Sequence, residues 1–156
     1  MKITALLFWL GASIVLWVIT PMVFVSINGA LGLPVYIFGM FRLIGIIFVI
    51  LGIIIALIAS LTFMKFGKGT PAIIDPPKKL VIKGLYKRTR NPIYVAHLLI
   101  FLGLFIFWGH VMLFALFVIG FIGFHLYILK TEEPVLEKRY REDYLKYMKV
   151  VPRWLW

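Results

Sequence analysis

The sequence contains no cysteine, and it is poor in acidic side chains, with 6 Asp and Glu against 17 Lys and Arg. The lack of cysteine excludes disulfide bonds, thiolate nucleophiles and cysteine-ligated metal sites. Charged residues make up only 15% of the chain, whereas about 25% is typical of a soluble domain. In their place the chain is 63% hydrophobic, with a mean hydropathy of +1.03. This composition predicts an integral membrane protein, and the length suits one all-α domain over residues 1–156.

The excess of cations gives a formal net charge of +11, which raises the question of nucleic-acid binding. The Lys and Arg residues flank the apolar runs instead of forming a separate basic face, so anionic lipid headgroups are the simpler partner, and we expect no nucleic acid. The sequence has no His/Asp/Glu triplet at metal-ligand spacing, so we expect no metal site. It also has no Ser-His-Asp set, P-loop or dinucleotide-binding glycine fingerprint.

Four apolar stretches have lengths that suit membrane-spanning helices, which need about 20 residues. They cover residues 3–20, 43–64, 92–108 and 111–129. The last two form one apolar run that is too long for a single crossing, so we expect a tight hairpin at Trp108-Gly109-His110. Pro21 is expected to end or kink the first span, and Ser26 to Pro34 to form a turn-rich connection.

The orientation follows from the distribution of charge. The segment from Lys65 to Arg90 holds eight Lys and Arg residues and one acid, Asp75, so the positive-inside rule makes it cytoplasmic. After Lys130 the chain is polar, with apolar residues at helical spacing, which predicts a cytoplasmic amphipathic helix over residues 133–149. We therefore predict a multi-pass protein with about four spans and with both termini in the cytoplasm.

The candidate functional residues lie where the apolar runs meet the charged segments. Asn91 is expected to cap the helix that Pro92 begins. His97 and His125 are the ionisable residues within the apolar runs, and such residues often mark function, although each equally suits a hydrogen-bonded position inside a helix bundle. Glu132 and Glu133 follow the fourth span directly. They suit either a cationic ligand with hydroxyl and ammonium donors or the acidic first turn of the C-terminal helix.

Gly45 and Gly52 lie seven residues apart, on one face of the second span. Small residues on one face allow two helices to pack closely. They also leave room for a ligand against the backbone. The sequence leaves both interpretations open.

Several short motifs follow one another within about the last 80 residues. They are Gly84-Leu85-Tyr86, Arg90-Asn91-Pro92-Ile93-Tyr94, Glu132-Glu133 and Val151-Pro152-Arg153. In this order and at this spacing they resemble the isoprenylcysteine carboxyl methyltransferase and phospholipid methyltransferase superfamily of integral membrane enzymes.

The resemblance implies that S-adenosylmethionine binds at the cytoplasmic ends of the last spans. It places Tyr86, Arg90, Asn91, Pro92 and Tyr94 on one side of the cofactor and Glu132 and Glu133 on the other, with Gly52 nearby. It further implies direct methyl transfer to a lipid-like acceptor, either an isoprenylcysteine-type carboxylate or a phospholipid amine. An amine must lose a proton, and His97 or His125 could assist in this step. Arg90, which could hold the methionine carboxylate, is the third candidate catalytic residue.

Two other functions remain open. One is an isoprenoid or sterol reductase, which shares a related membrane fold and uses a nicotinamide cofactor. The other is a non-catalytic membrane scaffold, which has no need for Arg90, Asn91, Tyr94 and two glutamates together.

Overall fold

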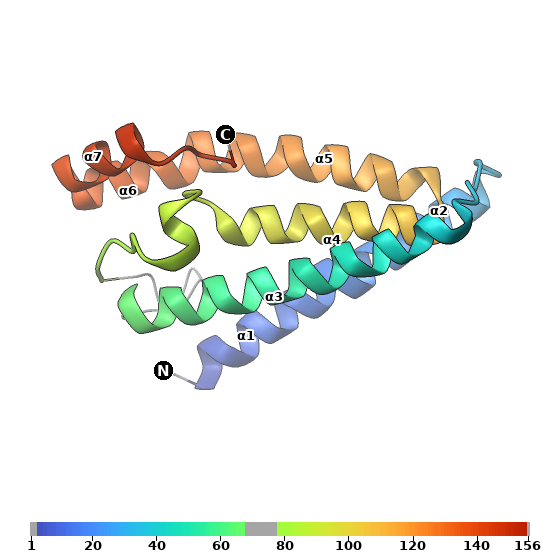
Figure 1. Ribbon diagram of the computed structural model, residues 1–156, viewed down its shortest axis with the longest axis horizontal. Coiled ribbons are helices and arrows are strands. Elements are labelled where there is room, and N and C mark those ends of the chain that lie inside the picture. Colours follow the sequence, from blue (N-terminus) through green and yellow to red (C-terminus); the bar gives the residue numbers. More distant parts are fainter. Residues whose placement is uncertain (1–2, 68–77, 156) are drawn as a thin grey trace.

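Long helices lie side by side in the structure, a computed structural model that describes residues 3–67 and 78–155 (Figure 1). Three of them, at Leu10–Ala30, Gly39–Gly67 and Val111–Tyr140, are long and apolar enough to cross a membrane. A shorter apolar helix covers Pro92–Trp108. Its 17 residues span about 25 Å, near the lower limit for a crossing, so the predicted count of four spans stays a prediction. The protein is thus an all-helical membrane protein over its described residues.

The first helix is longer than expected. It consists of α1 (Ile3–Ile14), the π-helical turn η1 (Val15–Ile19) and α2 (Thr20–Ala30), which follow one another without a break. Of the two outcomes expected at Pro21, an end or a kink, the helix does not end there. The expected connection from Ser26 to Pro34 is helical over its first half.

The π-helical turn accounts for how the helix passes Pro21. A proline inside an α-helix lacks an N–H and its ring conflicts with the carbonyl four residues earlier, here that of Trp17. In η1 the backbone N–H of Thr20 instead bonds to the carbonyl of Val15, five residues back, and the Thr20 hydroxyl bonds to the same oxygen at 3.0 Å. The wider turn accommodates the proline without ending the helix.

A buried asparagine holds the turn that follows α2. The side-chain amide of Asn28 donates to the carbonyl of Leu33 at 2.9 Å, and its oxygen accepts the backbone N–H of Met112 at 3.1 Å. The end of α2 is thereby joined to the start of α5 (Val111–Tyr127).

Two helices pack backbone against backbone at the centre of the bundle. They are α3 (Arg42–Gly67), preceded by the short 3-10 turn η2 (Gly39–Phe41), and α4 (Pro92–Trp108). A Cβ atom added at Gly45 would lie 2.6 Å from the carbonyl oxygen of Gly103, and one added at Gly52 would lie 2.9 Å from that of Ala96. Gly45 and Gly52 thus provide close helix packing, as one of the two sequence interpretations held.

The hairpin between α4 and α5 turns at Gly109, as predicted. Gly109 has φ 76°, a left-handed conformation that suits glycine, and its carbonyl accepts the backbone N–H of Tyr36 at 2.8 Å. A side chain at this position would collide with the Tyr36 carbonyl.

The C-terminal part differs from the predicted amphipathic helix over residues 133–149. Helix α5 continues through the π-helical turn η4 (Ile128–Glu132) into α6 (Glu133–Tyr140), and the chain turns only at Arg141, where φ is 48°. A separate helix, α7 (Glu142–Val150), follows. As at Pro21, the π-helical turn ends two residues before a proline, here Pro134, which explains why the helix does not stop after the span.

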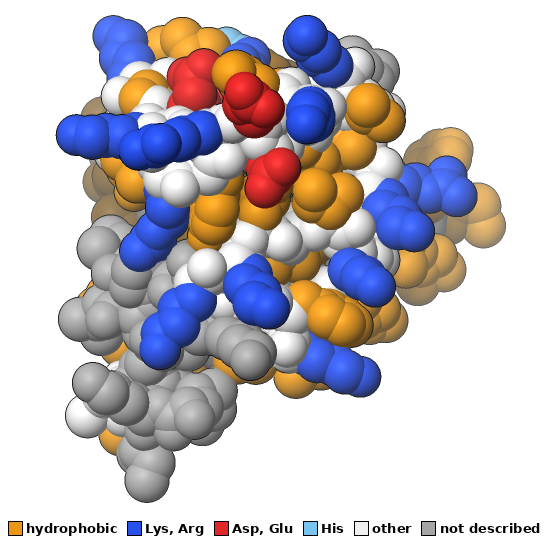
Figure 2. All heavy atoms as spheres, turned by 90° about the vertical axis from the view of Figure 1, so that its left-hand side faces the viewer, with side chains coloured by type: hydrophobic (Ala, Val, Ile, Leu, Met, Phe, Trp, Pro, Cys, Tyr) orange, Lys and Arg blue, Asp and Glu red, His pale blue; other side chains and the backbone are white. Residues whose placement is uncertain are grey.

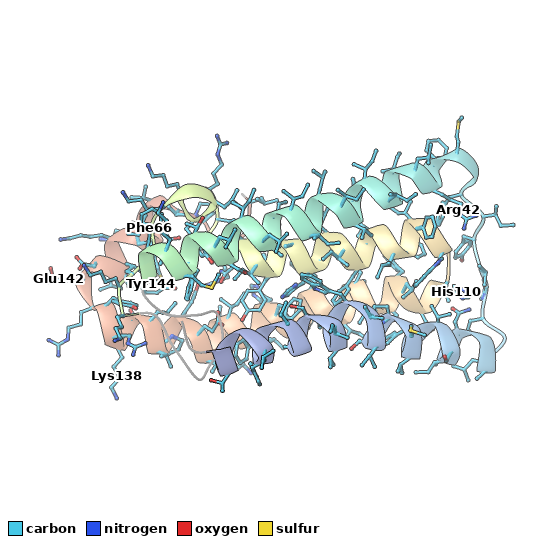
Figure 3. The ribbon with its side chains drawn as sticks, turned by 90° about the horizontal axis from the view of Figure 1, so that it is seen from below. Arg42, Phe66, His110, Lys138, Glu142 and Tyr144 are labelled. Carbon is cyan, nitrogen blue, oxygen red and sulfur yellow. The ribbon has the colours of Figure 1, made fainter. Side chains whose placement is uncertain are left out.

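The two ends of the bundle differ in character. Figure 3 shows Glu142, Tyr144 and Lys138 at one end and Arg42 and His110 at the other. We call the first the charged end; it consists of residues 78–91 and 130–155. The N-terminus lies toward the same end (Figure 1). The sequence has Gly69, Pro71, Pro76 and Pro77 after α3, a pattern that argues against a regular helix, but these positions lie outside the described residues.

Candidate functional site

A small cavity of about 50 Å³ lies at the charged end, between segments that are distant in the sequence. Side chains from α3, from residues 79–91, and from η4, α6 and α7 line it. They are Phe63, Lys79, Leu80, Val81, Tyr86, Arg90, Asn91, Ile128, Glu132, Glu133, Leu136, Tyr140, Tyr144 and Tyr147. The cavity therefore includes the cationic segment before α4 and the acidic pair after α5, which the sequence places 42 residues apart (Arg90 to Glu132).

Arg90 contributes the main positive charge of this cavity. Its side chain is 9% exposed, and its Nη2 atom lies 3.1 Å from Oε1 of Glu133. Its Nε and Nη1 atoms are buried and have no hydrogen-bond partner in the described part of the chain. Leaving a buried donor unsatisfied is costly, more so when the group is charged. Nε and Nη1 point to different sides of the guanidinium, so each can donate separately to an anionic oxygen, such as that of a carboxylate.

Glu133 is held by a second arginine. Arg153 Nε donates to Oε1 of Glu133 at 2.8 Å, and Arg153 Nη2 donates to Oε2 at 2.7 Å. The hydrogen bond to the carboxylate raises the pKa of Arg153 above its ordinary value. Since Arg153 occupies both oxygens and Arg90 also faces this carboxylate, Glu133 fixes the position of the Arg90 guanidinium.

Glu132 has different surroundings from its neighbour. The hydroxyl of Tyr94 donates to Oε1 of Glu132 at 2.6 Å, and the carboxylate is a lining group of the cavity. It lies in η4, where the π-helical turn alters which face of the helix each side chain occupies. The cavity thus presents an unsatisfied guanidinium and a carboxylate to the same small space.

Three buried tyrosines form the aromatic wall of the cavity. Tyr144 and Tyr147 lie on one face of α7, and the Tyr147 hydroxyl donates to the carbonyl of Tyr86 at 2.6 Å. Burial raises the pKa of Tyr144 to about 12, and it also raises the pKa of Tyr86 and of Tyr147. All three phenols therefore stay neutral over the physiological range.

The C-terminal segment is fastened to the start of α4. The backbone N–H of Arg90 bonds to the carbonyl of Pro152 at 2.9 Å, while the Thr89 hydroxyl and the Asn91 amide both donate to the carbonyl of Arg153, at 3.0 and 3.1 Å. Asn91 does stand at the N-cap position, but its side chain makes no capping hydrogen bond. The expected capping role is thus replaced by a contact with residues 152–154, which we call the C-terminal strap.

The other predicted site residues lie outside the cavity lining. Pro92 is buried at the first position of α4, and Gly52 contacts Ala96 and Ile100 at the crossing of α3 and α4. His97 and His125 lie deeper in the bundle, and each is hydrogen-bonded to a tryptophan. The roles predicted for these residues stay predictions.

Sequence reasoning did not assign a site role to Arg153, Tyr144 or Tyr147. Tyr144 and Tyr147 are three residues apart, followed by Val151 four residues later, so all three project from one face of a helix. That spacing predicted an apolar helix face, but it gave no indication that this face closes over Arg90. The contact between Arg153 and Glu133 had no local signal, because it depends on the chain turning back at Arg141.

Lys and Arg side chains are spread over the surface of the charged end, around a smaller acidic group (Figure 2). The cavity therefore opens on a surface that attracts anions. At the opposite end Arg42 is the one Lys or Arg between residues 3 and 64. The positive-inside rule associates the end that is richer in Lys and Arg, here the charged end, with the cytoplasmic side of the membrane.

Comparison with known proteins identifies a family. Residues 40–143, which are 104 of the 156 residues, match the model of the phospholipid methyltransferases. No curated protein and no solved structure gives a significant match to the chain. The matched region contains α3, the cationic segment, the hairpin of α4 and α5, and both glutamates, and it confirms the resemblance in the sequence. The chain therefore belongs to the phospholipid methyltransferase family.

Proposed function

We propose that this membrane protein transfers a methyl group from S-adenosylmethionine to a lipid-like acceptor in the membrane. The observation that supports this most directly is the buried Arg90 guanidinium, whose Nε and Nη1 have no hydrogen-bond partner among the described residues, in the same cavity as the Glu132 carboxylate. An amino acid zwitterion has the complementary charges. The methionine part of S-adenosylmethionine is such a zwitterion. Because the chain belongs to a methyltransferase family, this cofactor is the natural occupant of the cavity.

The residues of the cavity suit the parts of this cofactor. Arg90 would donate to the methionine carboxylate from Nη1, and Glu132 would accept from the amino group or from the ribose hydroxyls. The ring of Tyr86 lines the cavity, and that of Tyr94 lies outside the lining but bonds to Glu132; both offer faces for the adenine or for the sulfonium cation. In this arrangement Glu133 acts on Arg90 and does not itself bind the cofactor.

The cavity must widen to admit such a ligand. Its volume of about 50 Å³ is far below the roughly 300 Å³ or more that is usual for a small-molecule pocket. Several of its walls come from α7, which joins α6 through the turn at Arg141. Movement of α7 away from residues 79–91 would enlarge the space between Arg90 and Tyr144.

The chemistry requires little of the protein beyond alignment and the exclusion of water. When bound, the cofactor supplies an electrophilic methyl group: the acceptor lone pair forms the new bond to carbon while the electrons of the broken S–C bond remain on sulfur. The chain contributes by orienting the donor through Arg90 and Glu132 and by keeping the site dry with buried aromatic rings. A carboxylate acceptor needs no base, whereas an amine must release one proton.

Binding of S-adenosylhomocysteine tests this proposal. We expect it to raise the melting temperature of the purified protein in detergent, whereas NADPH should not, since a nicotinamide cofactor belongs to the reductase alternative. Arg90→Ala should weaken the affinity for S-adenosylhomocysteine by about 10- to 100-fold, because a hydrogen bond to a charged group contributes about 1.5–3 kcal/mol. Glu132→Gln should weaken it in the same direction.

Matched variants on the same surface provide the controls. Arg88 and Glu137 are exposed and do not line the cavity, so Arg88→Ala and Glu137→Gln should leave the affinity unchanged. Stabilisation by NADPH would indicate the reductase, and stabilisation by neither compound would leave a scaffold as the better description. Unchanged affinity in both Arg90→Ala and Glu132→Gln would remove these residues from the site.

A further inference from the structure

The two histidines inside the bundle share one arrangement. The indole N–H of Trp17 donates to Nδ1 of His97 at 3.0 Å, and that of Trp154 donates to Nδ1 of His125 at 3.2 Å. An indole nitrogen is a donor only, so each Nδ1 must present a lone pair. In the neutral imidazole the proton is then on Nε2.

This tautomer limits what His97 can do in a reaction. A histidine acts as a base through its unprotonated nitrogen, and in His97 that nitrogen faces Trp17. The remaining nitrogen, Nε2, already has a proton and can only donate a hydrogen bond. His97 is therefore arranged as a donor to an oxygen atom, not as a base toward an amine.

His97 lies between the charged end and the apolar part of the bundle. His97 follows Tyr94 by three residues on α4, and their rings are 6.3 Å apart. Tyr94 in turn bonds to Glu132 of the cavity. Carboxylate, phenol and imidazole thus follow one another at increasing depth, and at 1.5 Å per residue His97 lies about 7 Å beyond the start of α4.

The flank of the bundle beside these residues is poorly covered by protein. Helix α1 runs obliquely to α4 and diverges from it toward the N-terminus (Figure 1), and it makes few contacts with α3, α4 or α5. The first helix meets α4 at η1, where Trp17 bonds to His97. Tyr94, His97 and Phe124 each keep part of their surface exposed in the described part of the chain, and we infer that membrane lipid reaches them from this flank.

We propose that His97 binds the methyl acceptor by donating its Nε2–H to an oxygen of that molecule, and that Trp17 is a positioning residue that fixes this tautomer. The oxygen is either one of the two oxygens of an acceptor carboxylate, which is itself the reacting group, or a phosphate or ester oxygen just below the amine of a phospholipid. This inference rests on the proposed methyl transfer. His125 has the same tautomer, but its ring stacks on Phe121 and Trp154, so its bond fastens the C-terminal strap to α5.

The first test is spectroscopic and does not depend on enzymatic activity. The protein is labelled with ¹⁵N-histidine, placed in lipid nanodiscs and observed by NMR at neutral pH. We expect the His97 signals of a ring protonated on Nε2 alone, and we expect Trp17→Phe to produce a mixture of tautomers. Trp108→Phe, a change at the opposite end, is the matched control and should leave these signals unchanged. A proton on Nδ1 of His97, or a doubly protonated ring, would overturn the proposal.

The second test separates a donor from a base through the choice of replacement. The amide N–H of glutamine lies close to the position of Nε2–H, but an amide cannot accept a proton as a base. His97→Gln should therefore raise the KM for the acceptor less than threefold, whereas His97→Leu, which removes the donor, should raise it about tenfold. The probes are an ethanolamine phospholipid in phosphatidylcholine vesicles and N-acetyl-farnesylcysteine, which distinguish a phosphate or ester oxygen from a carboxylate.

The outcomes distinguish this inference from the proposed function. Loss of kcat by about 10²-fold or more in both His97 variants, with KM unchanged, is the result for a base and contradicts the proposal. If neither probe binds to the wild-type protein loaded with S-adenosylhomocysteine, the acceptor contact is likewise refuted. Failure of S-adenosylhomocysteine itself to bind refutes the proposed function, whatever the tautomer of His97.

Discussion

Glu132 and Glu133 are neighbours in the chain, yet they have different partners and, we infer, different tasks. Glu133 is occupied by the two nitrogens of Arg153 and by one nitrogen of Arg90, while Glu132 accepts from Tyr94 and lines the cavity. Neighbouring residues of a helix point about 100° apart, so the two carboxylates meet different partners. Under the proposed function, one residue organises the positive charge of the site and the other faces the cofactor.

Replacing Arg153 tests this division at the level of single residues. Arg153→Ala removes both bonds to Glu133, so the free energy of unfolding should fall by about 1.5–3 kcal/mol. The affinity for S-adenosylhomocysteine should fall as well, because Arg90 can then turn fully toward Glu133. Arg153→Lys should be intermediate, since an ammonium lacks the planar pair of donors. Thermal unfolding and ligand titration measure both effects.

The exposed Arg88→Ala variant is the control for this experiment. If Arg153→Ala were as stable as Arg88→Ala and bound the ligand equally well, the strap would have no part in positioning Arg90.

The buried tyrosines predict a dependence of stability on alkaline pH. Burial raises the pKa of Tyr144 to about 12, and an unfolded tyrosine has a pKa near 10. Because the folded-state value is the higher one, the unfolded chain binds fewer protons than the folded chain above pH 10, and stability falls as pH rises from about 10 to 12. The melting temperature in detergent should therefore decline above about pH 10.

A pair of phenylalanine variants identifies the source of this decline. Tyr144→Phe should reduce the alkaline loss of stability, whereas Tyr36→Phe, at a position that is 51% exposed, should not. Equal alkaline loss in wild type and Tyr144→Phe would show that this phenol is not responsible.

At the scale of elements, the prolines were where sequence-based boundaries failed. Pro21 and Pro134 are usual signals for a helix end or start. The sequence predicted an end or a kink at Pro21 and a new helix from residue 133, just before Pro134. In each case a π-helical turn ends two residues earlier and lets the helix continue. The two turns also contain Trp17 and Glu132, which take part in the interactions proposed for acceptor and cofactor. Local sequence does not reveal such a turn, because its stability depends on the helices that pack around it.

The glycines of α3 were interpreted correctly in part, and they give a prediction for the packing of α3 on α4. A Cβ atom at Gly52 would lie 2.6 Å from Cγ1 of Ile100 and 2.9 Å from the Ala96 carbonyl. Gly52→Ala should therefore destabilise the protein by about 1–3 kcal/mol. Gly123→Ala on α5 is the control, since nothing lies within 4 Å of the added atom. Alanine there should be neutral or slightly stabilising.

The same pair of variants bears on the predicted role of Gly52 near the cofactor. A lower melting temperature with unchanged affinity for S-adenosylhomocysteine would assign Gly52 to helix packing alone. If Gly52→Ala reduced the free energy of S-adenosylhomocysteine binding by more than it reduced the free energy of unfolding, the other interpretation, that Gly52 leaves room for a ligand, would hold.

At the scale of the molecule, the sequence allowed the helical membrane fold to be predicted and named residues that line one cavity, but it did not show how that cavity closes. Hydropathy defined the apolar helices, and the family motifs identified Arg90 and Glu132, which do line one cavity. The long-range contacts had no comparable signal. Arg153 reaches Glu133 only because the chain reverses at Arg141 and the strap then lies against Thr89 and Asn91. Such contacts form only when segments that are distant in the sequence fold against one another, so the spacing of residues along the chain does not predict them.

The predicted orientation in the membrane can be tested directly because the chain has no cysteine. Single cysteines can be introduced at exposed positions without any background: Arg88→Cys and Lys149→Cys at the charged end, and Ile37→Cys, at a position that is 90% exposed, at the opposite end. The cation-rich segments should remain in the cytoplasm. In intact cells a membrane-impermeant maleimide should therefore label Ile37→Cys alone, and lysis should expose the other two. Labelling of Arg88→Cys in intact cells would reverse the topology and would place the cofactor cavity on the side of the membrane that lacks cytoplasmic S-adenosylmethionine.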